Sequence, residues 1–347
     1  MIREAIDAAV AGRSLTMDEA SSVMREIMGG EATPAQLGAF LTALRLKGET
    51  TEEIAGMATV MREMALRVDV DGPLIDTVGT GGDGKNTFNI STATAFVAAA
   101  AGLKVAKHGN RAASGSCGSA DVLEALGVKI ELPPEDVARC INEAGLGFMF
   151  APAFHPAMRH AAPVRREIGI RTVFNILGPL TNPAGAQSQL LGVALAELGE
   201  KMAQVLLLLG AHHALIVHGE GGLDEISLAG DTSVWEVKGG AVKNWTLRVD
   251  DTGLPKTSID AIRGGTKEEN ADTMRRVLAG ETGAVRDVVL VNSAGVLLAG
   301  ELVDDIRQGV QRSAELIDNG SALGKLDHLV ELSQSLGAKR LDQGPRG

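Results

Sequence analysis

The sequence contains no tyrosine, and aromatic residues make up only 3% of its 347 residues. Because single-stranded nucleic acids are held largely by bases stacking on aromatic side chains, this scarcity argues against such a partner. The formal net charge of −11 points the same way, since a nucleic-acid backbone is normally met by a basic surface. We therefore expect no nucleic-acid partner.

Cysteine is also scarce. Cys117 and Cys140 are the only two in the chain, and neither has the spacing of a metal ligand or of a C-x-x-C motif. This excludes a disulfide framework and favours a reducing cytoplasm. The longest apolar run, Val285 to Ala299, is interrupted by charged residues and is predicted to be a buried helix. The N-terminus lacks the pattern of a signal peptide. We expect a cytoplasmic protein with no membrane partner.

With 45% hydrophobic and 22% charged residues, the composition is that of a globular protein, long enough for two domains or one large one. Residues 1–70 have the pattern of a small helical domain. Thr16, Thr33 and Thr50 each precede a run with apolar residues at helical spacing, and Pro34 stands at a favoured first position. The wide apolar faces of these helices need a cover, which is either a second copy of the chain or the rest of the same chain.

From Leu74 onward, short apolar runs alternate with helical patterns, which predicts an α/β domain over residues 71–340 with a central, mostly parallel sheet. Two later runs, at 233–237 and 244–249, predict an antiparallel addition that makes the sheet mixed. The remainder, from about 266, is predicted to be largely helical. The other expected strands are 74–78, 103–106, 128–132, 147–150, 188–194 and 213–218, and the expected helices are 89–101, 119–126, 134–144 and 197–210.

A glycine-rich loop follows the first of these strands, with glycines at 79, 81, 82 and 84. Such a loop between a strand and a helix lets backbone N–H groups approach an anion such as phosphate, although it is also an ordinary form of turn. Two known nucleotide motifs nearly match. The dinucleotide fingerprint lacks its downstream acid, because the next strand ends in Lys107-His108, and the Walker pattern has Asn86 where Ser or Thr is required.

A second glycine- and serine-rich loop follows the next strand, from Lys107 to Asp121, and contributes Lys107, Arg111, Ser114 and Ser119. Parallel strands bring both loops to one sheet edge. This arrangement favours the interpretation that the loops bind a ligand with more than one phosphate over the interpretation that they are ordinary connections. Asp224 and Glu225 end a later strand after a flexible Gly-Gly. An acidic pair of this kind is either solvated surface or, beside a polyphosphate, a Mg²⁺ site.

Taken together, these motifs resemble the anthranilate phosphoribosyltransferase family of tryptophan biosynthesis. The resemblance covers roughly residues 10 to 330 and keeps the family's order. The matching segments are Gly79–Asp83, Asn89–Thr92, Lys107–Arg111, Ser119–Asp121, His155–Met158, Arg165, Gly169–Pro183, His218-Gly219 and Leu223–Glu225.

The resemblance implies a fold of the nucleoside phosphorylase and phosphoribosyltransferase type. A small helical domain, with which the segment of about 163–186 packs, is joined to a large α/β domain, and two copies form a homodimer through the helical part. It also implies Mg²⁺ as cofactor, as a pair of ions held by Ser91, Asp224 and Glu225. Anthranilate would contact Gly79, Asn110, His155 and Arg165. Phosphoribosyl diphosphate would contact Gly79, Gly82, Asp83, Thr87, Asn89, Ile90, Ser91, Thr92, Lys107, His108, Gly109, Asn110, Arg111, Ala112, Ala113, Ser114, Gly115 and Ser119.

The sequence departs from the family pattern at Gly115, Ser116 and Cys117, where potential hydrogen-bond donors to phosphate are lost.

The implied reaction joins the amine of anthranilate to phosphoribosyl diphosphate. An arylamine is neutral near pH 7 and needs no strong base, so neither His108 nor His155 is assigned as a general acid or base, and both could be structural. Arg165 suits a carboxylate, since its fork binds in a bidentate manner, but could also be a solvated helix charge. The alternatives are a nucleoside phosphorylase of similar fold and a non-enzymatic, nucleic-acid-binding homologue.

Overall fold

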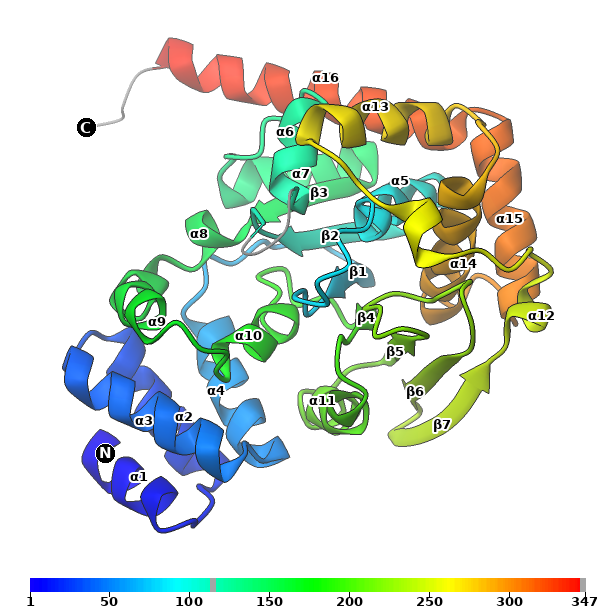
Figure 1. Ribbon diagram of the computed structural model, residues 1–347. Coiled ribbons are helices and arrows are strands. Elements are labelled where there is room, and N and C mark those ends of the chain that lie inside the picture. The colour runs from blue at the N-terminus through cyan, green and yellow to red at the C-terminus, as the bar shows by residue number, and fades with distance from the viewer. Residues whose placement is uncertain (113–116, 344–347) are drawn as a thin grey trace.

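The computed structural model describes residues 1–112 and 117–343. The predicted phosphate contacts of Ala113, Ser114 and Gly115 lie outside these described residues. A group of helices at the N-terminal end stands beside a twisted sheet that is covered by helices on both faces (Figure 1).

The N-terminal 63 residues form four helices, α1 (Ile2–Val10), α2 (Met17–Met28), α3 (Pro34–Lys47) and α4 (Thr51–Glu63). The last three begin where the sequence predicts. Thr16, Thr33 and Thr50 each accept a bond from the backbone three residues on, in complete capping boxes. Glu53 is fully buried in this part of the fold and is paired with Lys47 at 2.9 Å.

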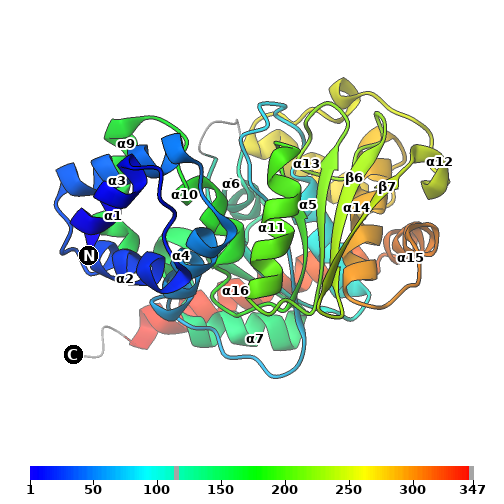
Figure 2. The same cartoon turned by 90° about the horizontal axis from the view of Figure 1, so that it is seen from below.

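A segment from the middle of the chain packs against these helices. It contains α8 (Ala151–Phe154), η1 (Pro156–His160), α9 (Ala162–Ile168), α10 (Phe174–Leu177) and η2 (Gly178–Leu180). Val164 and Leu177 share one apolar cluster with Leu41 and Met61, and the cluster continues onto the sheet at Leu191. Figures 1 and 2 both show α9 beside α3. Residues of α9 and α10 thus contact the N-terminal helices, while the domain division at residue 70 stays a prediction.

The sheet has seven strands in the order β3-β2-β1-β4-β5-β6-β7. The first five are parallel and the last two antiparallel, which confirms the predicted mixed, mostly parallel sheet. Trp235 and Trp245, the only tryptophans of the chain, lie on the β6–β7 hairpin. The strands are β1 (Leu74–Gly79), β2 (Lys104–Gly109), β3 (Leu146–Phe150), β4 (Ser188–Gly192), β5 (His213–Gly219), β6 (Thr232–Lys238) and β7 (Ala241–Leu247).

The strand predicted at 128–132 is wrong. This segment is irregular and joins α6 (Ser119–Ala125) to α7 (Pro134–Ala144). Its alternating pattern is real, because Val128, Ile130 and Leu132 are all buried. Their side chains belong to the apolar cluster that also contains residues of α16 (Ser321–Gln343), and Lys129 N donates to Ser333 Oγ of α16 at 3.1 Å. Alternating burial thus arises here from packing under a helix, while β3 occupies the place beside β2.

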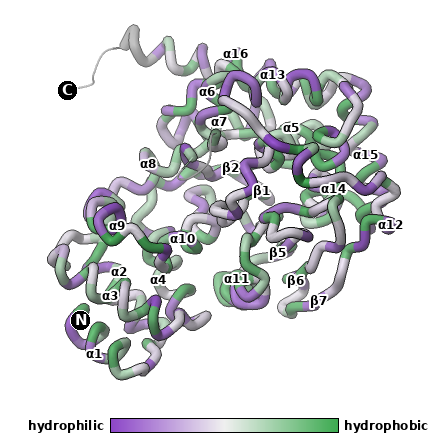
Figure 3. The backbone as a smooth tube through the Cα atoms, viewed as in Figure 1, coloured by the Kyte–Doolittle hydropathy of each residue, from purple (hydrophilic) through white to green (hydrophobic). Residues whose placement is uncertain are grey.

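The remaining helices are α5 (Ile90–Ala100), α11 (Glu197–Leu208), α12 (Val249–Thr252), α13 (Lys267–Leu278), α14 (Ala284–Ala299) and α15 (Ile306–Asp318), with η3 at Ile259–Ile262. The prediction of a buried helix over 285–299 is confirmed by α14, whose Asn292 is buried and bonded to both backbone groups of Ile226. On the opposite face, the ring of Trp235 packs directly over Gly199 of α11. Figure 3 shows hydrophobic and hydrophilic residues mixed along α11, as expected for a helix with one packed face. No helix within residues 1–112 and 117–343 is long and apolar enough to cross a bilayer.

Candidate active site

Two adjoining cavities lie at the carboxyl ends of the parallel strands. One, of about 610 Å³, is surrounded by the loops after β1, β2 and β5, and we call it the polar cavity. The other, of about 530 Å³, lies between the sheet and the α8–α10 segment, and we call it the apolar cavity. The polar cavity is lined by every described residue predicted to hold phosphoribosyl diphosphate or Mg²⁺, namely Gly79, Gly82, Asp83, Thr87, Asn89, Ile90, Ser91, Thr92, Lys107, His108, Gly109, Asn110, Arg111, Ala112, Ser119, Asp224 and Glu225.

The glycine loop requires its glycines for two different reasons. Gly81, Gly82 and Gly84 have φ between +66° and +73°, a region that side chains disfavour. Gly79 has ordinary backbone geometry, but a Cβ there would collide with the carboxylate of Asp224. The N–H of Gly81 donates to the same carboxylate at 2.7 Å. The loop is therefore folded directly against Asp224.

Three carboxylates crowd this side of the polar cavity. Burial, followed by the charge of Asp83, raises the pKa of Asp224 to about 6. Burial and then the charge of Asp224 raise the pKa of Glu225, against the opposing effects of Lys107 and the backbone N–H of Ser91. One oxygen of Asp83 is buried without a hydrogen-bond partner. Lys107 is the cation that acts on Glu225, and its effect is smaller than that of burial and of Asp224, so the cluster can accept further positive charge.

A divalent cation would supply that charge. The described part of the chain contains no group of three or more His, Cys, Asp or Glu side chains arranged to hold a metal by themselves. A bound ion would therefore complete its coordination with oxygens from elsewhere. This suits Mg²⁺, which usually takes one or two carboxylates together with substrate phosphates and water.

The two cationic side chains predicted for the polar cavity, Lys107 and Arg111, have different partners in the protein. Lys107 is 2% exposed, and its ammonium donates to Thr77 O at 2.7 Å and Ser91 Oγ at 3.3 Å. Burial lowers the pKa of Lys107, while Asp76 and Glu225 oppose that effect. These contacts place its positive charge between the glycine loop's strand and the start of α5.

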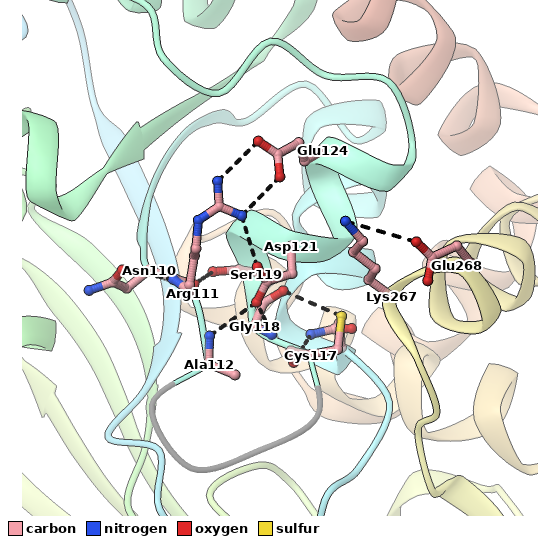
Figure 4. A network of polar contacts seen from close by, with 11 residues as sticks. Asn110, Arg111, Ala112, Cys117, Gly118, Ser119, Asp121, Glu124, Lys267 and Glu268 are labelled. Carbon is pink, nitrogen blue, oxygen red and sulfur yellow. Dashed lines mark hydrogen bonds and ion pairs between the residues drawn. The ribbon is translucent and has the colours of Figure 1, made fainter.

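Arg111 lines the polar cavity, and its guanidinium is directed to α6. Its guanidinium forms ion pairs with Asp121 at 2.9 Å and Glu124 at 2.8 Å (Figure 4). Asp121 also accepts the backbone N–H groups of Ala112 and Gly118, so it holds both flanks of the second loop. The carboxylates of α6 thus pair with the Arg111 guanidinium and order the loop, while Arg111 still lines the polar cavity and its contact with phosphate stays a prediction.

The apolar cavity is lined by all four residues predicted for anthranilate, Gly79, Asn110, His155 and Arg165, together with apolar side chains. The Arg165 guanidinium lies 5.0 Å from the centre of the Phe174 ring. Burial lowers the pKa of Arg165, and no carboxylate of the described residues forms an ion pair with it. A planar cation held over an aromatic ring, with no anionic partner of its own, can bind an aromatic carboxylate.

His108 and His155 lie in contact at the wall of this cavity, with ring centres 5.1 Å apart. Burial is the main cause that lowers the pKa of His108 to about 3 and that of His155 to about 4. Both rings are therefore neutral near pH 7. His108 Nε2 and both ring nitrogens of His155 are buried without a hydrogen-bond partner in the protein.

The two cavities share a wall. Val78, Gly79, Thr80, His108, Gly109, Asn110 and Asn175 line both of them. An anion held among the loops and an aromatic acid held near Arg165 would meet at this wall, at the end of β1 and β2.

Comparison with known proteins finds two family models that match this chain. Residues 71–323 match the model of the glycosyl transferase family, a/b domain, and residues 3–65 match that of the glycosyl transferase family, helical bundle domain. The chain is 61% identical over 335 residues to anthranilate phosphoribosyltransferase from Chloroflexus aurantiacus, covering 96% of this chain and 99% of that protein. The chain belongs to the anthranilate phosphoribosyltransferase family.

Solved structures of the family share this fold. The enzyme from Thermus thermophilus matches with a TM-score of 0.91 and 48% identity, over 95% of this chain and 99% of that one. The Saccharomyces cerevisiae enzyme in complex with phosphoribosyl diphosphate (PRPP) and Mg matches with a TM-score of 0.88 and 29% identity, over 96% and 98% of the two chains. The predicted family and fold are confirmed.

Sequence reasoning missed two residues of the α9–α10 segment that line the polar cavity. Arg171 donates to Gly81 O at 3.0 Å and to Gly82 O at 3.1 Å. Asn175 lines both cavities, and its Oδ1 accepts the N–H of Thr172. Both belong to the family segment Gly169–Pro183, from which the sequence analysis assigned no site residue. The resemblance of this segment to the family was the feature of the sequence that could have indicated a role for Arg171 and Asn175.

Proposed function

We propose that this protein transfers the phosphoribosyl group of 5-phosphoribosyl 1-diphosphate to the amine of anthranilate. The products are N-(5-phosphoribosyl)anthranilate and diphosphate, and the reaction belongs to L-tryptophan biosynthesis. The observation that carries this proposal is the junction of a polar, loop-lined cavity with an apolar cavity that contains an unpaired, half-buried arginine. Relatives and solved structures named for this activity support it.

The leaving diphosphate would bind in the polar cavity. The glycine loop and the N-terminus of α5 offer backbone N–H groups, and Lys107 offers a buried cation. Donors fixed before the reaction stabilise charge that develops on a leaving group, and this is usually a large part of catalysis. Once the loop is ordered around the bound substrate, these donors need little reorganisation when the C1–O bond breaks.

The proposed cofactor is Mg²⁺, held by Ser91, Asp224 and Glu225 as a pair of ions, with Asp83 beside them. The cofactor suits these residues because Asp83, Asp224 and Glu225 lie close together, and burial followed by the neighbouring carboxylate raises the pKa of Asp224 and of Glu225. When bound, Mg²⁺ supplies positive charge to the diphosphate oxygens. The S. cerevisiae structures with Mg bound support this choice of metal.

Anthranilate would bind in the apolar cavity with its carboxylate at Arg165 and its amine toward the shared wall. The neutral rings of His108 and His155 leave the amine unprotonated and offer it hydrogen-bonding nitrogens. No general base is required before attack, since an arylamine is neutral near pH 7. The wall residues Gly79 and Asn110 would hold the amine close to the ribose. Because no base is needed, proximity and orientation of the two substrates would be a main contribution of the protein to catalysis.

We further propose a homodimer formed through the helical domain, in the cytoplasm. Val10 of α1 is 74% exposed and Leu46 of α3 is 83% exposed, on two helices that pack together. Light scattering of the parent and of Leu46→Glu would test the assembly. A dimer that becomes a monomer on substitution is expected, and a monomeric parent would refute the proposal.

The activity is tested by following the fluorescence of anthranilate with purified protein, phosphoribosyl diphosphate and Mg²⁺. Loss of the signal, with equimolar release of diphosphate, is expected only when all three are present. Parallel reactions with a purine or pyrimidine nucleoside and inorganic phosphate test the phosphorylase alternative. Polarisation of a labelled oligonucleotide tests the nucleic-acid-binding alternative. Folded protein that leaves anthranilate unchanged would refute the transferase.

A further inference from the structure

Arg171 lines the polar cavity, and its segment continues to Phe174 and Asn175, which line the apolar cavity. The preceding helix, α9, ends at Ile168 and is capped by Gly169, whose φ of +67° turns the chain and whose N–H donates to Arg165 O. On the other side, the Thr172 N–H is bonded to Asn175 Oδ1, and Val173 is 1% exposed. The backbone of Arg171 is thus held from both sides, while its side chain is exposed and reaches the glycine loop.

The glycine loop is held on both sides by this contact. The N–H of Gly81 is bonded to Asp224, while the carbonyls of Gly81 and Gly82 accept from Arg171. A Cβ on Gly82 would lie 2.5 Å from the Arg171 guanidinium, so the two groups are in close contact. With its carbonyls turned to Arg171, the loop directs less negative charge toward an anion in the polar cavity.

The chain that carries Arg171 also forms the apolar cavity. Phe174, three residues further on, lines that cavity and supports the Arg165 guanidinium. Asn175 lines both cavities. An aromatic acid resting on Phe174 would therefore restrain the same short segment that holds Arg171 against the loop.

We propose that Arg171 is a positioning residue that couples the two cavities, so that occupation of the apolar cavity orders the glycine loop for diphosphate. This inference rests on the proposed function for the identity of the two ligands. Its physical basis is conformational entropy. A ligand in the apolar cavity that orders residues 171–175 has already lost that entropy, so a second ligand in the polar cavity binds with a smaller entropy loss. Arg171 acts through the loop and is not assigned a contact with the reacting atoms.

The coupling is measured with a pair of ligands that do not react with each other, anthranilate and Mg-diphosphate. The dissociation constant of anthranilate is determined by its fluorescence, first alone and then with saturating Mg-diphosphate. For the parent, we expect diphosphate to tighten anthranilate binding by at least about fivefold, the lower end of usual couplings between sites. For Arg171→Met, that ratio falls close to one, while the affinity for anthranilate alone is unchanged. Arg171→Lys retains part of the ratio, because an ammonium can reach one of the two carbonyls.

Arg166→Met is the matched control, since Arg166 is exposed and lines neither cavity. It removes the same charge from the same helix region and should keep the parent's ratio. Thermal melting of each variant shows that the fold persists. A parent ratio of one, or a ratio unchanged in Arg171→Met, overturns the coupling. Loss of anthranilate binding in Arg171→Met without diphosphate also overturns it, because Arg171 would then act directly in the apolar cavity.

The turnover assay separates the two proposals. A parent that consumes anthranilate but shows no coupling refutes only the role of Arg171. A parent that neither consumes nor binds anthranilate refutes the proposed function and this inference together.

Discussion

Arg165→Met tests how the protein recognises the acid group of its acceptor. The Arg165 guanidinium is half-buried, lies 5.0 Å from the Phe174 ring centre and has no carboxylate of its own among the described residues. Methionine keeps the length of the side chain and packs well on an aromatic ring, but it carries no charge and no donor. The substitution therefore removes the interaction with the carboxylate and little else.

The size of the effect follows from the kind of bond that is lost. Hydrogen bonds to a charged group contribute about 1.5–3 kcal/mol, which corresponds to about 10- to 150-fold in kcat/KM for anthranilate. The KM for phosphoribosyl diphosphate should not change, because Arg165 does not line the polar cavity. We expect no loss of thermal stability, since burial already disfavours the charge of Arg165.

Competition between anthranilate and aniline, which lacks the carboxylate, is the decisive assay. The parent should prefer anthranilate by about the same 10- to 150-fold factor, and the variant should lose that preference because both compounds then bind through the ring alone. If Arg165→Met still distinguishes the two acceptors as the parent does, the carboxylate lies elsewhere and our orientation of anthranilate is wrong. Loss of kcat for both acceptors alike would likewise contradict it.

Three further experiments test the other parts of the site. Asp224→Asn combined with Glu225→Gln should abolish the dependence of activity on Mg²⁺, measured by titration of the metal; a retained Mg²⁺ response would show that the ions bind elsewhere. Gly79→Ala places a Cβ against the Asp224 carboxylate, and overpacking of about 1–3 kcal/mol should lower kcat/KM for phosphoribosyl diphosphate by about 5- to 150-fold, without loss of fold by circular dichroism. His155 has its pKa lowered from 6.5 to about 4, so the unfolded chain binds a proton that the folded chain does not, and stability present above pH 6.5 is lost as the pH falls toward 4. Replacement by Asn should flatten the slope of unfolding free energy against pH by at most about 1.36 kcal/mol per pH unit, measured in urea, and an unchanged slope would show that His155 titrates normally.

The general position of the site could be predicted from the sequence because it depends on local patterns and one rule of topology. Gly79 is the last residue of β1, Lys107 lies near the end of β2 and Asp224 comes shortly after β5, and parallel strands bring their carboxyl ends to one edge of a sheet. Helix starts were equally local, as the capping boxes at Thr16 and Thr50 show.

What could not be predicted depends on contacts between distant parts of the chain. Arg171 reaches a loop 90 residues earlier in the sequence, and no periodicity marks such a contact. The ion pairs of Arg111 with Asp121 and Glu124 were likewise not predicted, because they depend on how the loop between β2 and α6 folds back on α6. In the segment 128–132, every second side chain is apolar and buried, as in a strand, yet the segment is not part of the sheet. An alternating sequence shows that one side of a segment is buried, but it does not show whether a strand or a helix covers that side.

The placement of the two tryptophans determines what an optical experiment on this protein can detect. With no tyrosine in the chain, near-ultraviolet emission comes from Trp235 and Trp245 on the β6–β7 hairpin. Trp235 is packed on α11 and Trp245 donates to Glu236, so their emission reports melting of that end of the sheet. Helices α1–α4 contribute to far-ultraviolet circular dichroism but not to this emission. If those helices unfold separately, the dichroism changes first and the emission stays constant, so a pair of melting curves shows whether the protein unfolds in one step or two.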